Sequence, residues 1–164
     1  HSAPPRYQSI VVLICLKLKS PPIITMAKIN GTWQLKSSEG LMDYMKACGS
    51  PAAALEKAKV LEVTGPAGGK EVFNVTGDTM TRKVLNKDNA VMKETTLKLG
   101  EEITGQTLDG RDVKIKMTFD GTTLTRHETG DGYTSTWERT IDGNIMTVVM
   151  KVGSVTCTRK YEKV

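Results

Sequence analysis

The sequence predicts an all-β fold: a ten-stranded antiparallel up-and-down barrel closed on itself, with a helix-turn-helix lid inserted after the first strand. Turn-forming pairs such as Asp109-Gly110, Asp120-Gly121 and Asp131-Gly132 recur about every ten to twelve residues, which is typical of strands joined by tight turns. Ten runs can form strands, one before and nine after a helical stretch. No helical pattern interrupts the nine, so there is no crossover for parallel strands. Such a meander exposes two edges unless its first and last strands join.

The first strand is expected around Trp33 and Leu35, which alternate with polar neighbours as in a half-buried strand. The apolar period then changes to that of a helix. Ser37 or Ser38 is the expected capping residue, with Glu39 in the first turn. The apolar face of this helix consists of Leu41, Met42, Tyr44 and Met45.

A second helix is expected over 52–62, with Ser50 as its N-cap and Pro51 at its first helical position. The glycine-rich stretch 64–71 follows and superficially resembles a phosphate-binding loop. The pattern fails because its first glycine is one place off, and because Glu71 stands where Ser or Thr would hold magnesium. The stretch also follows a helix, so we expect a connecting loop.

The last strand, over 155–163, has one wholly polar face. Its other face consists of Val155, Cys157, Arg159 and Tyr161. An unpaired guanidinium is strongly disfavoured in an apolar interior. We therefore expect an anion beside Arg159.

A second strand, over 133–141, repeats this pattern and places Arg139 on its apolar face. Together, Arg139, Arg159 and Tyr161 can hold a planar carboxylate by charge-assisted hydrogen bonds. Two alternatives stay open: each arginine pairs with a buried Glu or Asp, or one face is inverted. A pair of inward arginines inside a lidded barrel indicates an amphipathic acid as the ligand.

Composition and charge exclude several functions. The chain has 164 residues, about one domain, and a net charge of +5. Arg6, Lys17 and Lys19 account for three of these charges, which leaves +2 for the rest of the chain. Without a basic stripe or spaced aromatic residues, no nucleic-acid partner is expected.

The cysteines and histidines argue against metal and covalent chemistry. Cys15, Cys48 and Cys157 are far apart, which disfavours a disulfide framework or zinc site and favours a reducing compartment. His1 and His127 are the two histidines, too few for a metal cage or a histidine-based triad. We expect no metal, no cofactor and no enzymatic activity.

The domain is expected to span 26–164, after an extension over 1–25 that is a disordered leader outside the fold. The extension contains an apolar run over 9–18 that is too short to span a bilayer. A secretory signal is the alternative, although no small-residue cleavage site follows the run.

Several short motifs occur in order over 26–164: Gly31-Thr32-Trp33, Ser37-Ser38-Glu39, Asp43-Tyr44-Met45-Lys46, Leu99-Gly100-Glu101-Glu102, Asp109-Gly110-Arg111 and the run Val155-Thr156-Cys157-Thr158-Arg159-Lys160-Tyr161. On these motifs the chain resembles the intracellular lipid-binding proteins, the family of fatty-acid-binding and cellular retinoic-acid-binding proteins. That resemblance implies a ten-stranded barrel with a helical lid, as the residue pattern predicts independently. It also implies a monomeric cytoplasmic carrier.

The resemblance assigns roles to residues. Arg159 and Tyr161 match the family's R-x-Y motif and Arg139 matches its partner arginine, so these three are expected to bind the ligand's carboxylate. Cavity or portal positions are expected for Leu41, Tyr44, Met45 and Arg111. The chain departs from the family where Leu41 and Ala90 replace portal aromatics and where 63–70 is longer than usual. Retinol is disfavoured, because retinol carriers have glutamines at the arginine positions.

The resulting expectation is non-covalent binding and transport of a long-chain fatty acid or a similar hydrophobic carboxylic acid. Alternatives are a retinoic-acid-type carrier, a secreted lipid carrier and a membrane-stacking structural protein of the same fold. Lys46, Lys57 and Lys59 near the lid can contact anionic membrane surfaces transiently, or they form a solvated helix face.

Overall fold

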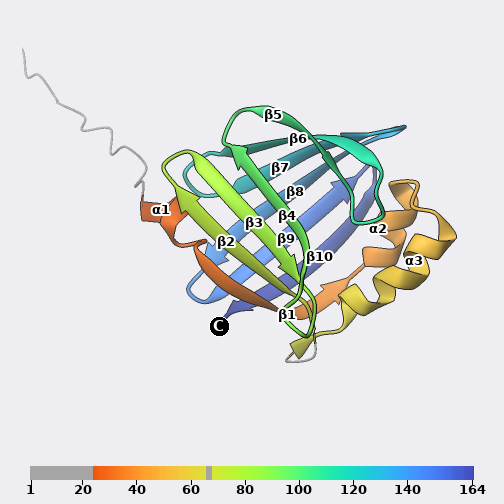
Figure 1. Ribbon diagram of the computed structural model, residues 1–164, viewed down its shortest axis with the longest axis horizontal. Helices are drawn as coiled ribbons and strands as arrows, with labels where there is room; N and C mark the ends of the chain where they lie inside the picture. The colour runs from red at the N-terminus through yellow and green to blue at the C-terminus, as the bar shows by residue number, and fades with distance from the viewer. Residues whose placement is uncertain (1–23, 66–67) are drawn as a thin grey trace, which may run out of the picture.

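Ten antiparallel strands form one continuous sheet in the computed structural model, which describes residues 24–65 and 68–164. The sheet curls into a nearly closed barrel (Figure 1). The elements are α1 (Ile24–Ala27), β1 (Gly31–Glu39), α2 (Leu41–Ala47), α3 (Ala52–Ala58), the 3-10 helix η1 (Lys59–Glu62), β2 (Lys70–Thr76), β3 (Thr79–Leu85), β4 (Val91–Lys98), β5 (Glu102–Gln106), β6 (Asp112–Phe119), β7 (Leu124–Gly130), β8 (Tyr133–Asp142), β9 (Ile145–Val152) and β10 (Val155–Lys163).

The first and last strands join, as predicted. The strand order is β4-β3-β2-β1-β10-β9-β8-β7-β6-β5, so the two ends of the sheet are β4 and β5. The β1–β10 ladder pairs Leu35 with Tyr161 and Ser38 with Arg159. This pairing brings the C-terminal Arg-x-Tyr motif beside the lid, because the lid follows β1 directly.

Tight turns connect the strands where the sequence predicted them. Asp142 pairs with Ile145 across β8 and β9, and Val152 pairs with Val155 across β9 and β10. Gly143 and Gly153 lie in these turns with φ of 57° and 55°. Two-residue hairpin loops need such positive φ values, which glycine adopts without steric cost.

The predicted start of the first helix is wrong. Ser37 and Ser38 belong to β1, which keeps pairing with β10 as far as Glu39. The helix begins after Gly40, whose φ is 81° and whose position leaves no room for a side chain. Serine and glutamate are good capping residues, but here the ladder hydrogen bonds to β10 decide their conformation.

The second predicted helix is divided in two. Pro51, and not Ser50, is the N-cap of α3, and the Ser50 hydroxyl accepts a hydrogen bond from Arg111. The helix ends at Ala58, and the chain continues as the 3-10 helix η1 to Glu62. Tight 3-10 turns are common at the ends of α-helices.

The predicted loop over 64–71 is two residues too long at its end. Lys70 and Glu71 open β2, where Glu71 pairs with Trp33 on one side and Val84 on the other. Glu71 is 4% exposed. A glutamate at this depth requires a charged partner, which β3 provides as described below.

Helices lie at both ends of the barrel (Figure 1): α2 and α3 cover one end, and the short α1 lies near the other. Near α1, the buried Trp33 donates a hydrogen bond of 2.7 Å to the Ile29 carbonyl. Most of the expected extension, 1–23, lies outside the described residues, and the expected boundary at residue 26 falls within α1. Among the described helices, none combines the length and apolar character needed to cross a membrane.

Candidate functional site

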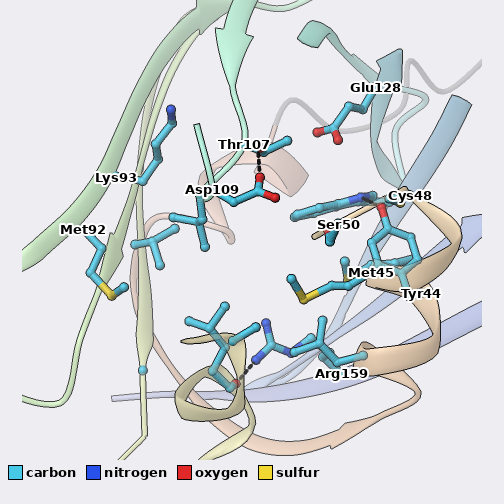
Figure 2. A pocket seen from close by; sticks show the side chains of 18 of the residues that line it. Tyr44, Met45, Cys48, Ser50, Met92, Lys93, Thr107, Asp109, Glu128 and Arg159 are labelled. Atoms are coloured by element: carbon cyan, nitrogen blue, oxygen red, sulfur yellow. Dashed lines mark hydrogen bonds between the residues drawn. The ribbon is translucent and has the colours of Figure 1, made fainter. Parts of the chain in front are cut away.

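A cavity of about 280 Å³ lies inside the barrel beneath the lid. Figure 2 shows Tyr44 and Met45 from α2, Glu128 from β7 and Arg159 from β10 around the same open space. Much of the lining is apolar, including Leu35, Leu41, Ala58, Leu61, Val84 and Met150. Charged side chains also line it, among them Glu71, Arg82, Arg126, Glu128 and Arg159. The cavity can therefore surround a hydrocarbon chain and meet a polar group at defined points.

Arg159 connects the last strand to the lid. Its guanidinium donates a hydrogen bond to the carbonyl oxygen of Leu61 in η1. It also lies 5.6 Å from the centroid of the Tyr161 ring. Its buried Nε has no hydrogen-bond partner in the described part of the chain. Arg159 therefore reaches the cavity with donor capacity to spare.

Arg139 lies deeper than Arg159 and does not line the large cavity. It is 2% exposed and faces a second space of about 20 Å³ together with Met26 and Ile29 near α1. None of its three guanidinium nitrogens makes a hydrogen bond to the described residues. Burial lowers the pKa of Arg139 to about 10, against the opposing effect of Glu71, so the side chain is charged at neutral pH. Arg139 and Arg159 lie in one row across the sheet, because both pair with Val148.

Glu71 is the anion that meets these groups. Its carboxylate accepts hydrogen bonds from Arg82 Nη2 at 2.6 Å and Nε at 3.2 Å. The Tyr161 hydroxyl donates to it at 3.3 Å, and Arg139 Nη2 lies 3.5 Å away without a hydrogen bond. Burial would raise the pKa of Glu71, but the positive charges of Arg82 and Arg139 outweigh it and lower the pKa to about 2. The sequence left open that an inward arginine pairs with a buried glutamate, and Arg139 does so with Glu71.

A second buried ion pair lies in β7, between Arg126 and Glu128. Arg126 donates two hydrogen bonds to one oxygen of Glu128, and the Tyr133 hydroxyl donates to the other at 2.7 Å. The Arg126 guanidinium also lies 4.7 Å from the centroid of the Trp137 ring. Burial lowers the pKa of Arg126, and the negative charge of Glu128 opposes this effect.

The interior charges do not cancel. Four arginines project inward from β3, β7, β8 and β10: Arg82, Arg126, Arg139 and Arg159. They face two buried glutamates of β2 and β7, Glu71 and Glu128. Arg82 and Arg126 form hydrogen-bonded ion pairs, Arg139 reaches Glu71 at 3.5 Å without a hydrogen bond, and Arg159 makes no ion pair in the described part of the chain. The site therefore favours an anionic guest beside the latter two arginines.

Tyr44 attaches the lid to β8. The Tyr44 hydroxyl lies 2.5 Å from the Ser135 hydroxyl and accepts a hydrogen bond of 2.7 Å from Trp137 Nε1. The Tyr44 and Trp137 rings meet edge to face, with centroids 6.4 Å apart. Burial raises the pKa of Tyr44, so its hydroxyl is neutral at pH 7.

Arg111 fastens the rim of the cavity. Its guanidinium donates to the Cys48 carbonyl at 2.6 Å and to the Ser50 hydroxyl at 3.0 Å, and it pairs with Asp109 at 3.0 Å. It thereby joins the β5–β6 loop to the end of α2. The structure places Leu41, Tyr44, Met45 and Arg111 along the cavity.

Sequence reasoning missed four site residues: Glu71, Arg82, Arg126 and Glu128. The alternation that revealed Arg139 and Arg159 is also present for Arg82, which lies between the inward Met80 and Val84 in β3. In β7 it places Leu124, Arg126 and Glu128 on the inner face. The sequence did not identify Glu71 as an inward strand residue, because the glycines before it predicted a loop.

Comparison with known proteins found relatives over most of the chain. Human fatty acid-binding protein 12 is 34% identical over 139 residues, which cover 84% of this chain and 92% of that protein. Bovine fatty acid-binding protein 5 is 31% identical over 140 residues, which cover 85% of this chain and 98% of that protein. No protein-family model matches the sequence.

Solved structures of similar fold include a Schistosoma mansoni fatty acid binding protein in complex with arachidonic acid. It has a TM-score of 0.74 and 26% identity, covering 85% of this chain and 98% of that protein. A structure described as the REP1-NXSQ fatty acid transporter has a TM-score of 0.72 and 27% identity, covering 84% of this chain and 97% of the other.

Proposed function

The chain belongs to the intracellular lipid-binding protein family that includes the fatty acid-binding proteins, and on this basis we propose that it carries a long-chain fatty acid or a similar hydrophobic carboxylic acid inside its barrel. Like these fatty acid-binding relatives, it is a binding protein and not an enzyme. The observation that carries the proposal is a largely apolar cavity lined by Arg159, which makes no ion pair in the described part of the chain, with the buried Arg139 nearby, which reaches Glu71 at 3.5 Å without a hydrogen bond.

The two parts of such a ligand have different tasks. Each methylene buried in the cavity contributes about 0.8 kcal/mol, so the hydrocarbon chain provides most of the affinity. A hydrogen bond to a charged head group adds roughly 1.5–3 kcal/mol. That increment sets the orientation of the ligand and selects a free acid over a neutral ester.

The proposed carboxylate site consists of Arg159, Tyr161 and Arg139. Arg159 and Tyr161 line the cavity, and the Nε of Arg159 is unpartnered in the described structure. Arg139 lies in the same row, with Val148 of β9 between it and Arg159, and adds a buried positive charge. A carboxylate is planar and accepts two donors at once, which matches guanidinium geometry.

The proposed entry passes the lid, where apolar and basic side chains lie together. Met92 and Leu108 line the cavity and are 45% and 50% exposed. Lys57 lines the same opening, whereas Lys46 and Lys59 pair with acidic residues one helical turn away. We propose transient contact of this monomeric, cytoplasmic carrier with anionic membranes through this rim.

The test is a titration of lipid-free protein with an 18-carbon fatty acid, its methyl ester, retinoic acid and retinol. The fatty acid should bind about tenfold or more tightly than the ester, the ratio that one charge-assisted hydrogen bond provides. Folded protein that binds neither fatty acid nor retinoic acid would overturn the proposal. Aggregation of liposomes without acid binding would instead support a membrane-stacking role.

A further inference from the structure

Glu71 occupies a place where the proposed clamp would receive its ligand. Its carboxylate lies between the Tyr161 hydroxyl at 3.3 Å and the Arg139 guanidinium at 3.5 Å. Tyr161 and Arg139 are two of the three groups expected to hold a fatty-acid carboxylate. The chain thus supplies an anion of its own at this point.

The contacts of Glu71 are unequal in strength. Arg82 holds the carboxylate through two nitrogens, the nearer at 2.6 Å. The contact with Tyr161 is long for a hydrogen bond between oxygens, and the contact with Arg139 is an ion pair without a hydrogen bond. A competing carboxylate can therefore take over Tyr161 and Arg139 while Glu71 stays on Arg82.

We propose that Glu71 is a built-in counter-ion of the carboxylate clamp, which an incoming fatty acid must displace from Tyr161 and Arg139. The inference rests on the proposed function and deepens it by naming the residue that limits affinity for anionic heads. In the empty protein Glu71 partly neutralises Arg139, which would otherwise be a buried charge with no anion beside it.

The displaced carboxylate continues to act on the ligand. Glu71 is ionised at neutral pH, because its neighbouring arginines lower its pKa to about 2. Two carboxylates that share one arginine cluster repel each other, and the repulsion is strong in a buried site with little screening. Glu71 therefore weakens the binding of acids and leaves the binding of neutral esters nearly unchanged.

The test compares Glu71→Gln with Glu128→Gln. Both side chains are buried, both accept hydrogen bonds from an arginine and a tyrosine, and both border the same cavity. Glu128 accepts its hydrogen bonds from Arg126 and Tyr133, neither of which belongs to the proposed clamp. Either substitution adds one positive charge to the interior, so the pair separates local displacement from a general change of charge.

The measured quantity is the ratio of the dissociation constants of methyl ester and free acid. This ratio should rise about tenfold in E71Q and by less than about threefold in E128Q, relative to the unmodified protein. An unchanged ratio in E71Q, or an equal rise in both variants, would overturn the inference. If the unmodified protein binds no acid, it is the proposed function that fails.

A second measurement covers the case in which E71Q does not fold. Protein labelled with ¹³C at glutamate carboxyl carbons, with the Glu71 signal assigned by its loss in Glu71→Asp, is titrated with acid and with ester. The acid should move the Glu71 signal, because its hydrogen bond from Tyr161 is lost, and the ester should not. The displacement is contradicted if the chemical shift of Glu71 does not change when the acid binds, or if it changes equally with both ligands.

Discussion

The guanidinium of Arg159 donates a hydrogen bond to the carbonyl oxygen of Leu61, which joins the last strand of the barrel to the end of its lid. In the proposed carboxylate site, a ligand carboxylate would share this guanidinium with the Leu61 carbonyl. The proposal therefore predicts that head-group binding and lid attachment are coupled through one side chain.

Arg159→Leu should lose the preference for acid over ester. We expect the acid to bind about ten- to a hundredfold more weakly, and the ester to bind almost as before, because one charge-assisted contact disappears. The measurement is calorimetric titration of both ligands. Lys160→Leu is the matched control, since Lys160 is the next residue of β10 and its side chain is exposed. Equal losses for acid and ester in R159L would contradict the assignment of Arg159 to the clamp.

Glu71 should make the free energy of unfolding depend on pH in the acidic range. Its pKa is about 2 in the folded protein, against an ordinary value of 4.5. A lowered pKa stabilises the fold above pH 4.5, and this stabilisation disappears as pH falls towards 2. The loss is on the order of 3 kcal/mol for a shift of this size.

Urea unfolding at pH 6, 4.5 and 3 measures this dependence. Glu71→Gln should be less stable at pH 6 and should lose less stability between pH 4.5 and 3 than the unmodified protein. If the free energy of unfolding changes equally with pH in the two proteins, Glu71 is not the cause of this pH dependence.

The barrel was predictable because its signals are local. The turn pairs near Gly143 and Gly153 and the alternating strands between them define hairpins without knowledge of distant residues. The position where the lid begins was not predictable, because Ser37 and Ser38 serve equally well as helix caps or as strand residues. Their conformation is decided by pairing with β10, more than a hundred residues later.

The site was predictable in part for the same reason. Inward arginines on two apolar strand faces revealed Arg139 and Arg159. Their partners depend on strand register: Glu71 meets Arg82 because β2 pairs with β3. The carbonyl of Leu61 is a backbone group, and no side-chain pattern identifies it as the partner of Arg159.

Tyr44→Phe should loosen the lid and destabilise the fold. The substitution removes the acceptor of Trp137 Nε1 and the partner of the buried Ser135 hydroxyl. Unsatisfied buried groups cost about 1–3 kcal/mol, which urea unfolding detects. The fluorescence of Trp137 should also change, because its indole loses a hydrogen-bond partner.

Tyr133→Phe is the control for this change. Its hydroxyl donates to Glu128, which keeps its ion pair with Arg126 when the hydroxyl is lost. We expect a smaller loss of stability in Y133F than in Y44F. Equal losses would mean that the Tyr44 contacts add nothing specific to the attachment of the lid.

Gly40→Ala should be more harmful than a glycine substitution in a hairpin turn. Gly40 has φ of 81°, and a Cβ atom there would lie 2.6 Å from the carbonyl oxygen of Thr156 in β10. Gly132 has φ of 75°, with nothing within 4 Å of a Cβ. Gly132→Ala therefore costs backbone strain of roughly 1–2 kcal/mol, whereas G40A adds a clash with a backbone atom of Thr156, which the β9–β10 ladder holds in place.

We expect G40A to lose about 3 kcal/mol or more in thermal or urea unfolding, because strain and clash add. The same clash pushes the start of α2 away from β10, so ligand should enter and leave G40A faster than G132A in stopped-flow exchange. Equal stability of the two variants would mean that the chain can shift at Gly40, and that the close approach to Thr156 does not fix where the lid begins.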